Sequence, residues 1–125
     1  MARMRAGLPV IIDGDGEQTR DLLYVSDAVD AIQAAGRLGV AGAFNIGTGS
    51  AVTINAVFTE LARLTGYVRP PEFGPARIGD IRHSTLDSTL AWKRLRWRAR
   101  TSLASGLAST LAAGAVAHGS SIAPT

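Results

Sequence analysis

The sequence predicts a small α/β fold in which short strands are combined with about four helices. Apolar residues recur at helical spacing after Val25 and again after Ile54, which indicates two amphipathic helices. Residues 10–12 and 43–46 are instead short apolar runs of the kind found in strands. Glycine and proline residues separate these segments. At 125 residues with 46% apolar content, the chain suits one domain with a modest core, which we place at residues 1–112.

The first segments are predicted to be a helix, a strand and a turn. Residues 1–6 form the end of a helix, because Gly7 favours a helix C-terminus and Pro9 cannot continue the helix. Residues 10–12 form a strand that leads into a glycine-rich turn at residues 14–16, where glycine tolerates positive φ. We therefore expect a sharp reversal of the chain at this turn.

A second helix is expected to begin at Ser26. The serine hydroxyl is suited to the N-cap, and Asp27 places a negative charge in the first turn, where the helix dipole favours it. The apolar positions of this helix are Val25, Ala28, Val29 and Ile32. Arg20 therefore lies on an extended segment between the turn and the start of the helix.

A third helix is predicted over residues 54–65. Thr53 is its expected N-cap, Gly66 ends it, and its apolar stripe is interpreted as core. Residues 43–46 precede it as a brief strand. Residues 67–82 contain three prolines and two glycines, so we expect an extended or looped segment there.

Two further helices are predicted towards the end of the chain. Asp87 is expected to cap a short helix that ends at Leu95, with Trp97 packed behind it, and Thr101 is expected to cap the final helix. Residues 113–125 consist largely of alanine, glycine and serine and contain no Asp, Glu, Lys or Arg. We predict that they form a disordered tail.

Composition excludes several classes of site. The chain has no cysteine, which rules out disulfides, thiolate metal ligands and a cysteine nucleophile. No stretch reaches the roughly 18–20 apolar residues that span a membrane, and no secretion signal opens the chain, so we expect a cytoplasmic location and no membrane partner. The basic cluster at residues 93–100 is interpreted as a solvated face. Nucleic-acid binding is the alternative, which we do not favour because no recognition motif accompanies the cluster.

Three stretches of the sequence resemble one protein family. They are G-D-G-E-Q-T-R-D followed by Y-V-S-D within residues 14–27, F-N-I-G-T-G at residues 44–49, and P-A-R-I-G-D-I-R-H-S at residues 75–84. Together they are similar to the C-terminal half of the NAD-dependent epimerases and dehydratases of nucleotide sugars, which are extended short-chain dehydrogenase/reductases (extended SDRs). The resemblance covers most of the chain. It implies a substrate-binding portion that lacks the N-terminal Rossmann domain.

The sequence departs from the pattern of this family at three positions. Family members usually have an aromatic residue at the place of Asp13, glycine at the place of Arg96 and proline at the place of Ala99. A left-handed helix end without glycine costs up to about 1 kcal/mol.

Two arginines are the main candidates for ligand binding. A guanidinium group offers paired donors that match phosphate oxygens, so Arg20 and Arg77 could together hold a diphosphate. The resemblance implies this contact for both of them. The alternative from the residues alone is that each arginine pairs with a neighbouring carboxylate, Asp21 or Asp80, and only holds a loop in place.

Three further residues complete the candidate substrate-binding site. The resemblance implies that Asp80 contacts a hydroxyl of the nucleotide sugar or braces Arg77, and we favour the brace. Gln18 lies beside the glycine-rich turn. Asn45 lies in F-N-I-G-T-G, where a short polar side chain also serves to satisfy backbone groups.

We predict no catalytic, NAD-binding or metal-binding residue within this chain. Proton transfer in the family depends on a Tyr-x-x-x-Lys pair, but Tyr24 is followed four residues later by Ala28, and Tyr67 by Pro71. The sequence also lacks a glycine-rich strand–helix unit for the pyrophosphate of NAD, a Gly-x-Ser-x-Gly elbow and an HExxH motif. NAD is therefore expected as a cofactor of whole family members and not of this chain alone.

The resemblance implies that the chain is the UDP-sugar-binding portion of an NAD-dependent sugar 4-epimerase. In whole family members NAD⁺ oxidises the C4 hydroxyl of the sugar, and the hydride returns to the other face. Two alternatives stay open, namely a stand-alone nucleotide-sugar binding or regulatory module and an inactive truncated gene product. The expected ligand partner is a UDP-sugar or a related nucleotide sugar. An NAD-binding half and self-association of the chain are the further partners that stay open.

Overall fold

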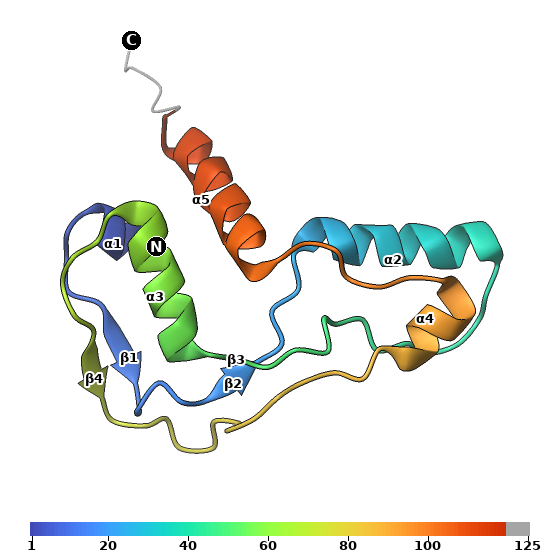
Figure 1. Ribbon diagram of the computed structural model, residues 1–125, viewed down its shortest axis with the longest axis horizontal. Helices are drawn as coiled ribbons and strands as arrows, with labels where there is room; N and C mark the ends of the chain where they lie inside the picture. The colour runs from blue at the N-terminus through green and yellow to red at the C-terminus, as the bar shows by residue number, and fades with distance from the viewer. Residues whose placement is uncertain (120–125) are drawn as a thin grey trace, which may run out of the picture.

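The computed structural model describes the backbone of residues 1–119 and the side chains of residues 1–114. This part of the chain forms five helices and four short strands (Figure 1). Their bounds in chain order are α1 (Ala2–Arg5), β1 (Ile11–Asp13), β2 (Thr19–Arg20), α2 (Val25–Leu38), β3 (Val52–Thr53), α3 (Ile54–Thr65), β4 (Glu72–Gly74), α4 (Thr89–Leu95) and α5 (Leu103–Gly119). The predicted α/β class with short strands is confirmed, and each of the five helices corresponds to a segment predicted to be helical.

The elements form two groups at opposite ends of an elongated molecule. Helices α1 and α3 lie with strands β1 and β4 at one end, whereas α2 and α4 pack together at the other end (Figure 1). Helix α5 packs against α3, and its C-terminal end extends beyond that helix (Figure 1). The short pair of β2 and β3 lies between the two ends.

Two strand pairs fix the backbone around the glycine-rich turn. Strand β1 pairs in parallel with β4, which places Asp13 opposite Gly74. Strand β2 pairs antiparallel with β3, which places Arg20 opposite Val52. Residues 43–46, predicted as a strand, are not one, because within the described chain no second segment pairs with their backbone.

Two apolar cores hold the helices. The first lies between α2 and α4 and is built from Ala31, Ala34, Ala91, Leu95 and Trp97. The second joins α1, α3 and α5 and is built from Met4, Leu61, Tyr67 and Leu111. The predicted packing of Trp97 behind the short helix is confirmed, and its Nε1 donates to the backbone carbonyl of Asp27 at 2.9 Å. The stripe of α3 is core as predicted, since Val57, Phe58 and Leu64 pack against Leu61.

The ends of α3 agree with the sequence prediction. The hydroxyl oxygen of Thr53 accepts a hydrogen bond from the Ala56 N–H at 3.1 Å, which makes it the N-cap. Gly66 follows the last turn with φ +68°, in the left-handed conformation that glycine adopts without strain. Both caps are therefore confirmed.

The N-caps of α2 and α5 differ from the predicted ones, whereas Asp27 lies in the first turn of α2 as predicted. Helix α2 begins at Val25 after an N-cap at Tyr24, so Ser26 is not the cap. The buried carboxylate of Asp27 instead accepts a hydrogen bond from the Thr101 N–H at 3.0 Å, which holds the entry to α5 against α2. Ser102, and not Thr101, then caps α5, since its Oγ accepts from the Ser105 N–H at 3.2 Å.

Helix α4 begins near the predicted position and ends with an unusual residue. Ser88 is at the N-cap, while the carboxylate of Asp87 accepts from the Thr89 N–H at 2.9 Å, and hydrogen bonding to Thr89 lowers the pKa of Asp87. Arg96 follows the last turn with φ +54°, and among the described residues it is the one non-glycine residue with positive φ. Its N–H donates to the Trp92 carbonyl at 3.1 Å, so the left-handed conformation closes the helix.

Helix α5 is longer than predicted. The predicted disordered tail begins at residue 113, but the helix continues to Gly119, so the prediction is corrected for residues 113–119. Four of these seven residues are alanine or valine, and alanine has the highest intrinsic helix propensity. The rest of the predicted tail, residues 120–125, lies outside the described residues.

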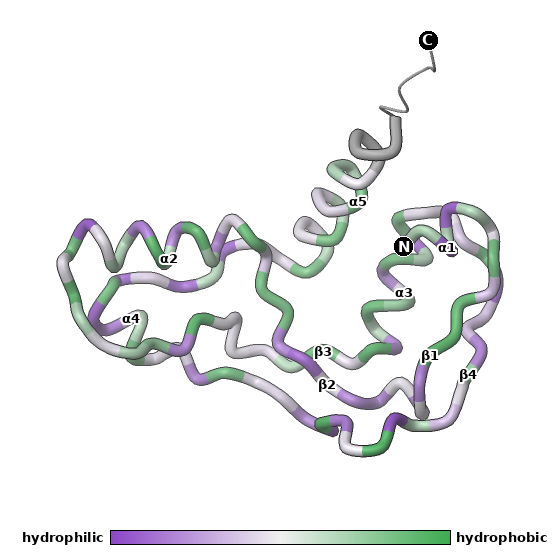
Figure 2. Tube along the Cα trace, turned by 180° about the vertical axis from the view of Figure 1, so that it is seen from behind, coloured by the Kyte–Doolittle hydropathy of each residue, from purple (hydrophilic) through white to green (hydrophobic). Residues whose placement is uncertain are grey.

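The apolar stripe of α2 faces away from the core. Val25 is 66% exposed and Ile32 is 73% exposed, while the smaller Ala31 and Ala34 provide the buried face. Hydrophobic residues therefore recur along the open side of α2 as well as its packed side (Figure 2).

The glycine-rich turn packs tightly against the first turn of α3. Gly16 has φ +75°, and a Cβ added there would lie 2.0 Å from the Asn55 Oδ1. The Asn55 side-chain amide donates to the Asp15 carbonyl at 3.0 Å and to the Glu17 carboxylate at 2.6 Å. Glycine is thus required at this position both for its backbone conformation and for space.

Candidate functional site

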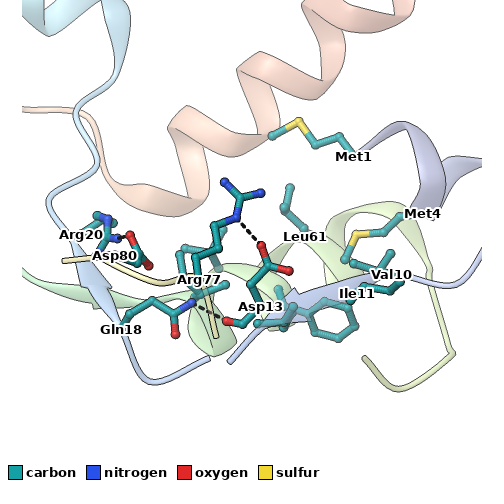
Figure 3. Close-up of a pocket in the computed structure, with 14 residues that line it drawn as sticks. Met1, Met4, Val10, Ile11, Asp13, Gln18, Arg20, Leu61, Arg77 and Asp80 are labelled. Atoms are coloured by element: carbon teal, nitrogen blue, oxygen red, sulfur yellow. Dashed lines mark hydrogen bonds and ion pairs between the residues drawn. The ribbon is translucent and has the colours of Figure 1, made fainter. Parts of the chain in front are cut away.

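A pocket of about 370 Å³ lies where α1, β1, β2, α3 and the loop after β4 meet. Its apolar wall consists of Met1, Met4, Val10, Ile11, Ile12, Ile54, Val57, Phe58 and Leu61. Its polar side chains are Asp13, Gln18, Arg20, Arg77 and Asp80 (Figure 3). Four of the five predicted substrate-binding residues therefore come together in one pocket.

The backbone brings distant segments to this pocket. The loop after β4 runs beside β2, where the Thr19 N–H donates to the Arg82 carbonyl at 2.9 Å and the Ser84 N–H donates to the Thr19 carbonyl at 3.2 Å. The hydroxyl of Thr19 also bonds to the Nδ1 of His83 at 3.1 Å. Pairing of β1 with β4 holds the other side of the same loop. The loop of residues 75–84 is thus fixed at both ends.

Arg20 is held by three contacts on one side of the pocket. Its Nη2 lies 2.6 Å from the Asp80 carboxylate, and its Nη1 donates to the backbone carbonyls of Thr19 at 2.8 Å and Ile81 at 2.5 Å. The sequence favoured Asp80 as a brace for Arg77, but the arginine that Asp80 contacts is Arg20, so the predicted partner is corrected (Figure 3).

Arg77 is held by a single carboxylate. Its Nε lies 2.6 Å from Asp13 Oδ2, and 78% of its side-chain surface is exposed, against 41% for Asp13 (Figure 3). The Gln18 Nε2 donates to the backbone carbonyl of the same aspartate at 2.9 Å. Neither carboxylate that the sequence offered as a partner, Asp21 or Asp80, makes the ion pair with Arg77.

Asp21 has a separate role away from the arginines. Its carboxylate accepts hydrogen bonds from the Thr48 hydroxyl at 2.6 Å and from the N–H groups of Thr48, Gly49 and Leu86. Partial burial acts to raise the pKa of Asp21, but these hydrogen bonds outweigh it and the net pKa is lowered. Asp21 thus ties the F-N-I-G-T-G segment to the chain near residue 86.

A third ion pair closes the glycine-rich turn. The two terminal nitrogens of Arg82 lie 2.7 and 2.8 Å from the two carboxylate oxygens of Asp15, a bidentate geometry. This hydrogen bonding lowers the pKa of Asp15 from 3.8 to about 2. Arg82 does not line the pocket, so the pair fixes the loop without occupying the site.

Two results differ from the site predicted from sequence. Asn45 is exposed and does not line the pocket. Asp13 was not predicted as the partner of Arg77, although an aspartate in place of the aromatic residue usual at that position was a visible signal. Within the described residues there is no group of three His, Cys, Asp or Glu side chains that could hold a metal ion. No helix in this part of the chain is long and apolar enough to cross a membrane.

Comparison with known proteins identifies the family. Residues 1–47 match the model of the NAD-dependent epimerase/dehydratase family. A UDP-glucose 4-epimerase from Mycolicibacterium smegmatis is 42% identical over 107 residues, which cover 85% of this chain and 34% of the relative. The chain belongs to the NAD-dependent epimerase/dehydratase family. It spans about a third of the length of the curated relatives that it matches.

Solved structures of this epimerase/dehydratase family share the fold. The UDP-glucose 4-epimerase of Thermotoga maritima, crystallised with UDP-glucose, superposes with a TM-score of 0.83 at 40% identity, over 93% of this chain and 38% of that protein. MoeE5 in complex with UDP-glucose and NAD superposes with a TM-score of 0.83 at 41% identity, over 93% of this chain and 40% of that protein. The chain therefore has the architecture of one part of these larger enzymes.

Proposed function

We propose that this chain binds the diphosphate of a UDP-sugar and forms the substrate-binding part of an NAD-dependent sugar 4-epimerase. The observation that carries the proposal is that Arg20 and Arg77, from segments far apart in the sequence, line one pocket. Guanidinium groups match phosphate oxygens with paired N–H donors, and two of them suit the two phosphates of a nucleotide diphosphate. The solved relatives that contain UDP-glucose support the same class of ligand.

The other residues of the proposed site act on the two arginines or on the backbone. Asp80 is proposed to orient Arg20 through their 2.6 Å contact. Gln18 is proposed to hold the end of β1 through its bond to the Asp13 carbonyl. Asn45 lies outside the pocket, so we assign it only a secondary contact with the ligand.

On this proposal residues 1–125 bind the substrate but do not convert it. The sequence contains neither a Tyr-x-x-x-Lys pair nor a glycine-rich unit for NAD. We therefore expect no conversion of UDP-glucose to UDP-galactose when the chain is incubated with UDP-glucose and NAD⁺. Turnover that survives repurification of the chain would contradict this part of the proposal.

Calorimetric titration of UDP and UDP-glucose tests the proposed site. The parent chain should bind both, and Arg20→Ala or Arg77→Ala should each weaken binding by about tenfold or more, because a hydrogen bond to a charged group contributes about 1.5–3 kcal/mol. Arg63→Ala is the matched control, since Arg63 pairs with Glu60 on α3 and does not line the pocket. Circular dichroism establishes that each variant is folded. A folded parent chain that binds neither ligand would refute the proposal.

A further inference from the structure

The charges that line the pocket cancel one another. Two arginines face two aspartates, and each arginine has one carboxylate oxygen at 2.6 Å. A phosphate that enters this pocket therefore meets cations that are already paired. The affinity of the pocket for phosphate therefore depends on whether the two carboxylates stay paired with the arginines or are displaced by the ligand.

The two ion pairs differ in how firmly they are held. Arg20 keeps two backbone carbonyl contacts in addition to Asp80, so its position does not depend on the carboxylate alone. Arg77 has, among the contacts found in the described residues, only the bond from its Nε to Asp13. Its side chain is also the more exposed of the two arginines. The Asp13–Arg77 pair is thus the one that a ligand can open at little cost.

The backbone keeps Asp13 beside the pocket even when the pair opens. Asp13 is the last residue of β1, opposite Gly74 of β4, and its carbonyl accepts from Gln18. These contacts involve the main chain and do not need the carboxylate. A negative charge therefore remains at the edge of the pocket after Arg77 turns to a ligand.

We propose that Asp13 is an internal counter-ion of Arg77 that competes with the phosphate of the ligand and so weakens its binding. This inference rests on the proposed diphosphate site. Binding is then an exchange in which one anion replaces another on Arg77, and the displaced carboxylate repels the phosphate that has replaced it. Asp13 thereby sets the affinity of the site without contacting the sugar.

The test compares Asp13→Asn with the parent chain in calorimetric titrations with UDP, inorganic pyrophosphate and uridine. Asparagine has the same shape and keeps the backbone contacts, so the variant should bind UDP and pyrophosphate about three- to tenfold more tightly. Uridine has no phosphate and should gain nothing. Glu60→Gln is the control, because it removes the same charge from another 2.6 Å ion pair whose residues do not line the pocket, and its UDP affinity should stay within about twofold of the parent.

A second set of variants separates the counter-ion from other effects. The gain should be smaller when Asp13→Asn is made in an Arg77→Ala background, because only the repulsion between residue 13 and the phosphate is then relieved. Asp13→Ser should reproduce the full gain if the asparagine perturbs folding in the first variant. If the parent binds UDP through Arg77 but Asp13→Asn binds it no more tightly, the proposed role of Asp13 as a counter-ion is refuted. The proposed diphosphate site would still be supported by that result. Equal gains for uridine would also refute the role of Asp13 as a counter-ion. Failure of both the parent and the Asp13 variants to bind UDP would overturn the inference together with the proposed function.

Discussion

Replacing Arg96 by glycine should stabilise the protein. Arg96 is exposed and has φ +54° and ψ +30° at the end of α4. The left-handed conformation costs an L-residue about 1–2 kcal/mol, and glycine adopts it freely. Glycine also gives the unfolded chain more freedom, which removes about 0.4–1 kcal/mol of the gain. The hydrogen bond from the residue 96 N–H to the Trp92 carbonyl is kept. We expect a net increase of about 0.5–1 kcal/mol in the free energy of unfolding.

Thermal and urea unfolding followed by circular dichroism measure this effect. A gain of about 0.5–1 kcal/mol raises Tm by about 2–5 °C for a chain of this size. Arg96→Ala is the matched control, because it removes the same guanidinium but keeps a Cβ at positive φ, and it should leave Tm within about 1 °C of the parent. If Arg96→Gly is less stable than Arg96→Ala, the left-handed conformation is not strained and the reasoning is wrong.

Three other variants test the packing and the acid response of the fold. Trp97→Phe removes the N–H that donates to the buried Asp27 carbonyl, and it should lower the free energy of unfolding by about 1–3 kcal/mol. Urea unfolding measures this loss, and an unchanged urea midpoint would contradict a stabilising role for the hydrogen bond. Gly16→Ala should lower the free energy of unfolding by at least about 1 kcal/mol more than Gly7→Ala does. Both positions have positive φ, but only Gly16 packs against α3. Equal losses of stability in the two variants would argue against that contact. Hydrogen bonding to a guanidinium lowers the pKa of Asp15 from 3.8 to about 2, so its contribution to stability is present above pH 3.8 and is lost as the pH falls towards 2. The stability of Asp15→Asn should therefore depend less on pH in this range than the stability of the parent. Acid unfolding followed by circular dichroism measures this, and identical curves for the variant and the parent would exclude a contribution from Asp15.

Local signals predicted the elements whose stability is local. Helix α3 was predicted from its own residues because Thr53 caps it, Gly66 ends it and its stripe packs on one side. Strand β4 was not predicted, because it exists through pairing with β1, and its own sequence contains a glycine and follows two prolines. Asp27 illustrates the same limit, since its hydrogen bond with Thr101 joins residues 74 positions apart and no local pattern reveals it.

The candidate site was predictable in composition but not in its pairing. The resemblance drew attention to Arg20 and Arg77, and both line the pocket. Which carboxylate meets which arginine depends on the path of residues 75–84 across β1 and β2, and no local pattern encodes that path. Asp13 therefore became visible as the partner of Arg77 only in three dimensions.

The parallel pairing of β1 with β4 has a consequence for the order in which the molecule folds. Asp13 and Arg77 are 64 positions apart, and β4 must reach β1 before they can meet. Closing so long a loop is entropically costly and slow, whereas α3, which lies inside that loop, can form in about a microsecond. On the ribosome the pocket can be assembled only after residue 80 has been synthesised and released from the exit tunnel. The pocket is therefore a late product of folding, and a nascent chain exposes its apolar wall until β4 arrives.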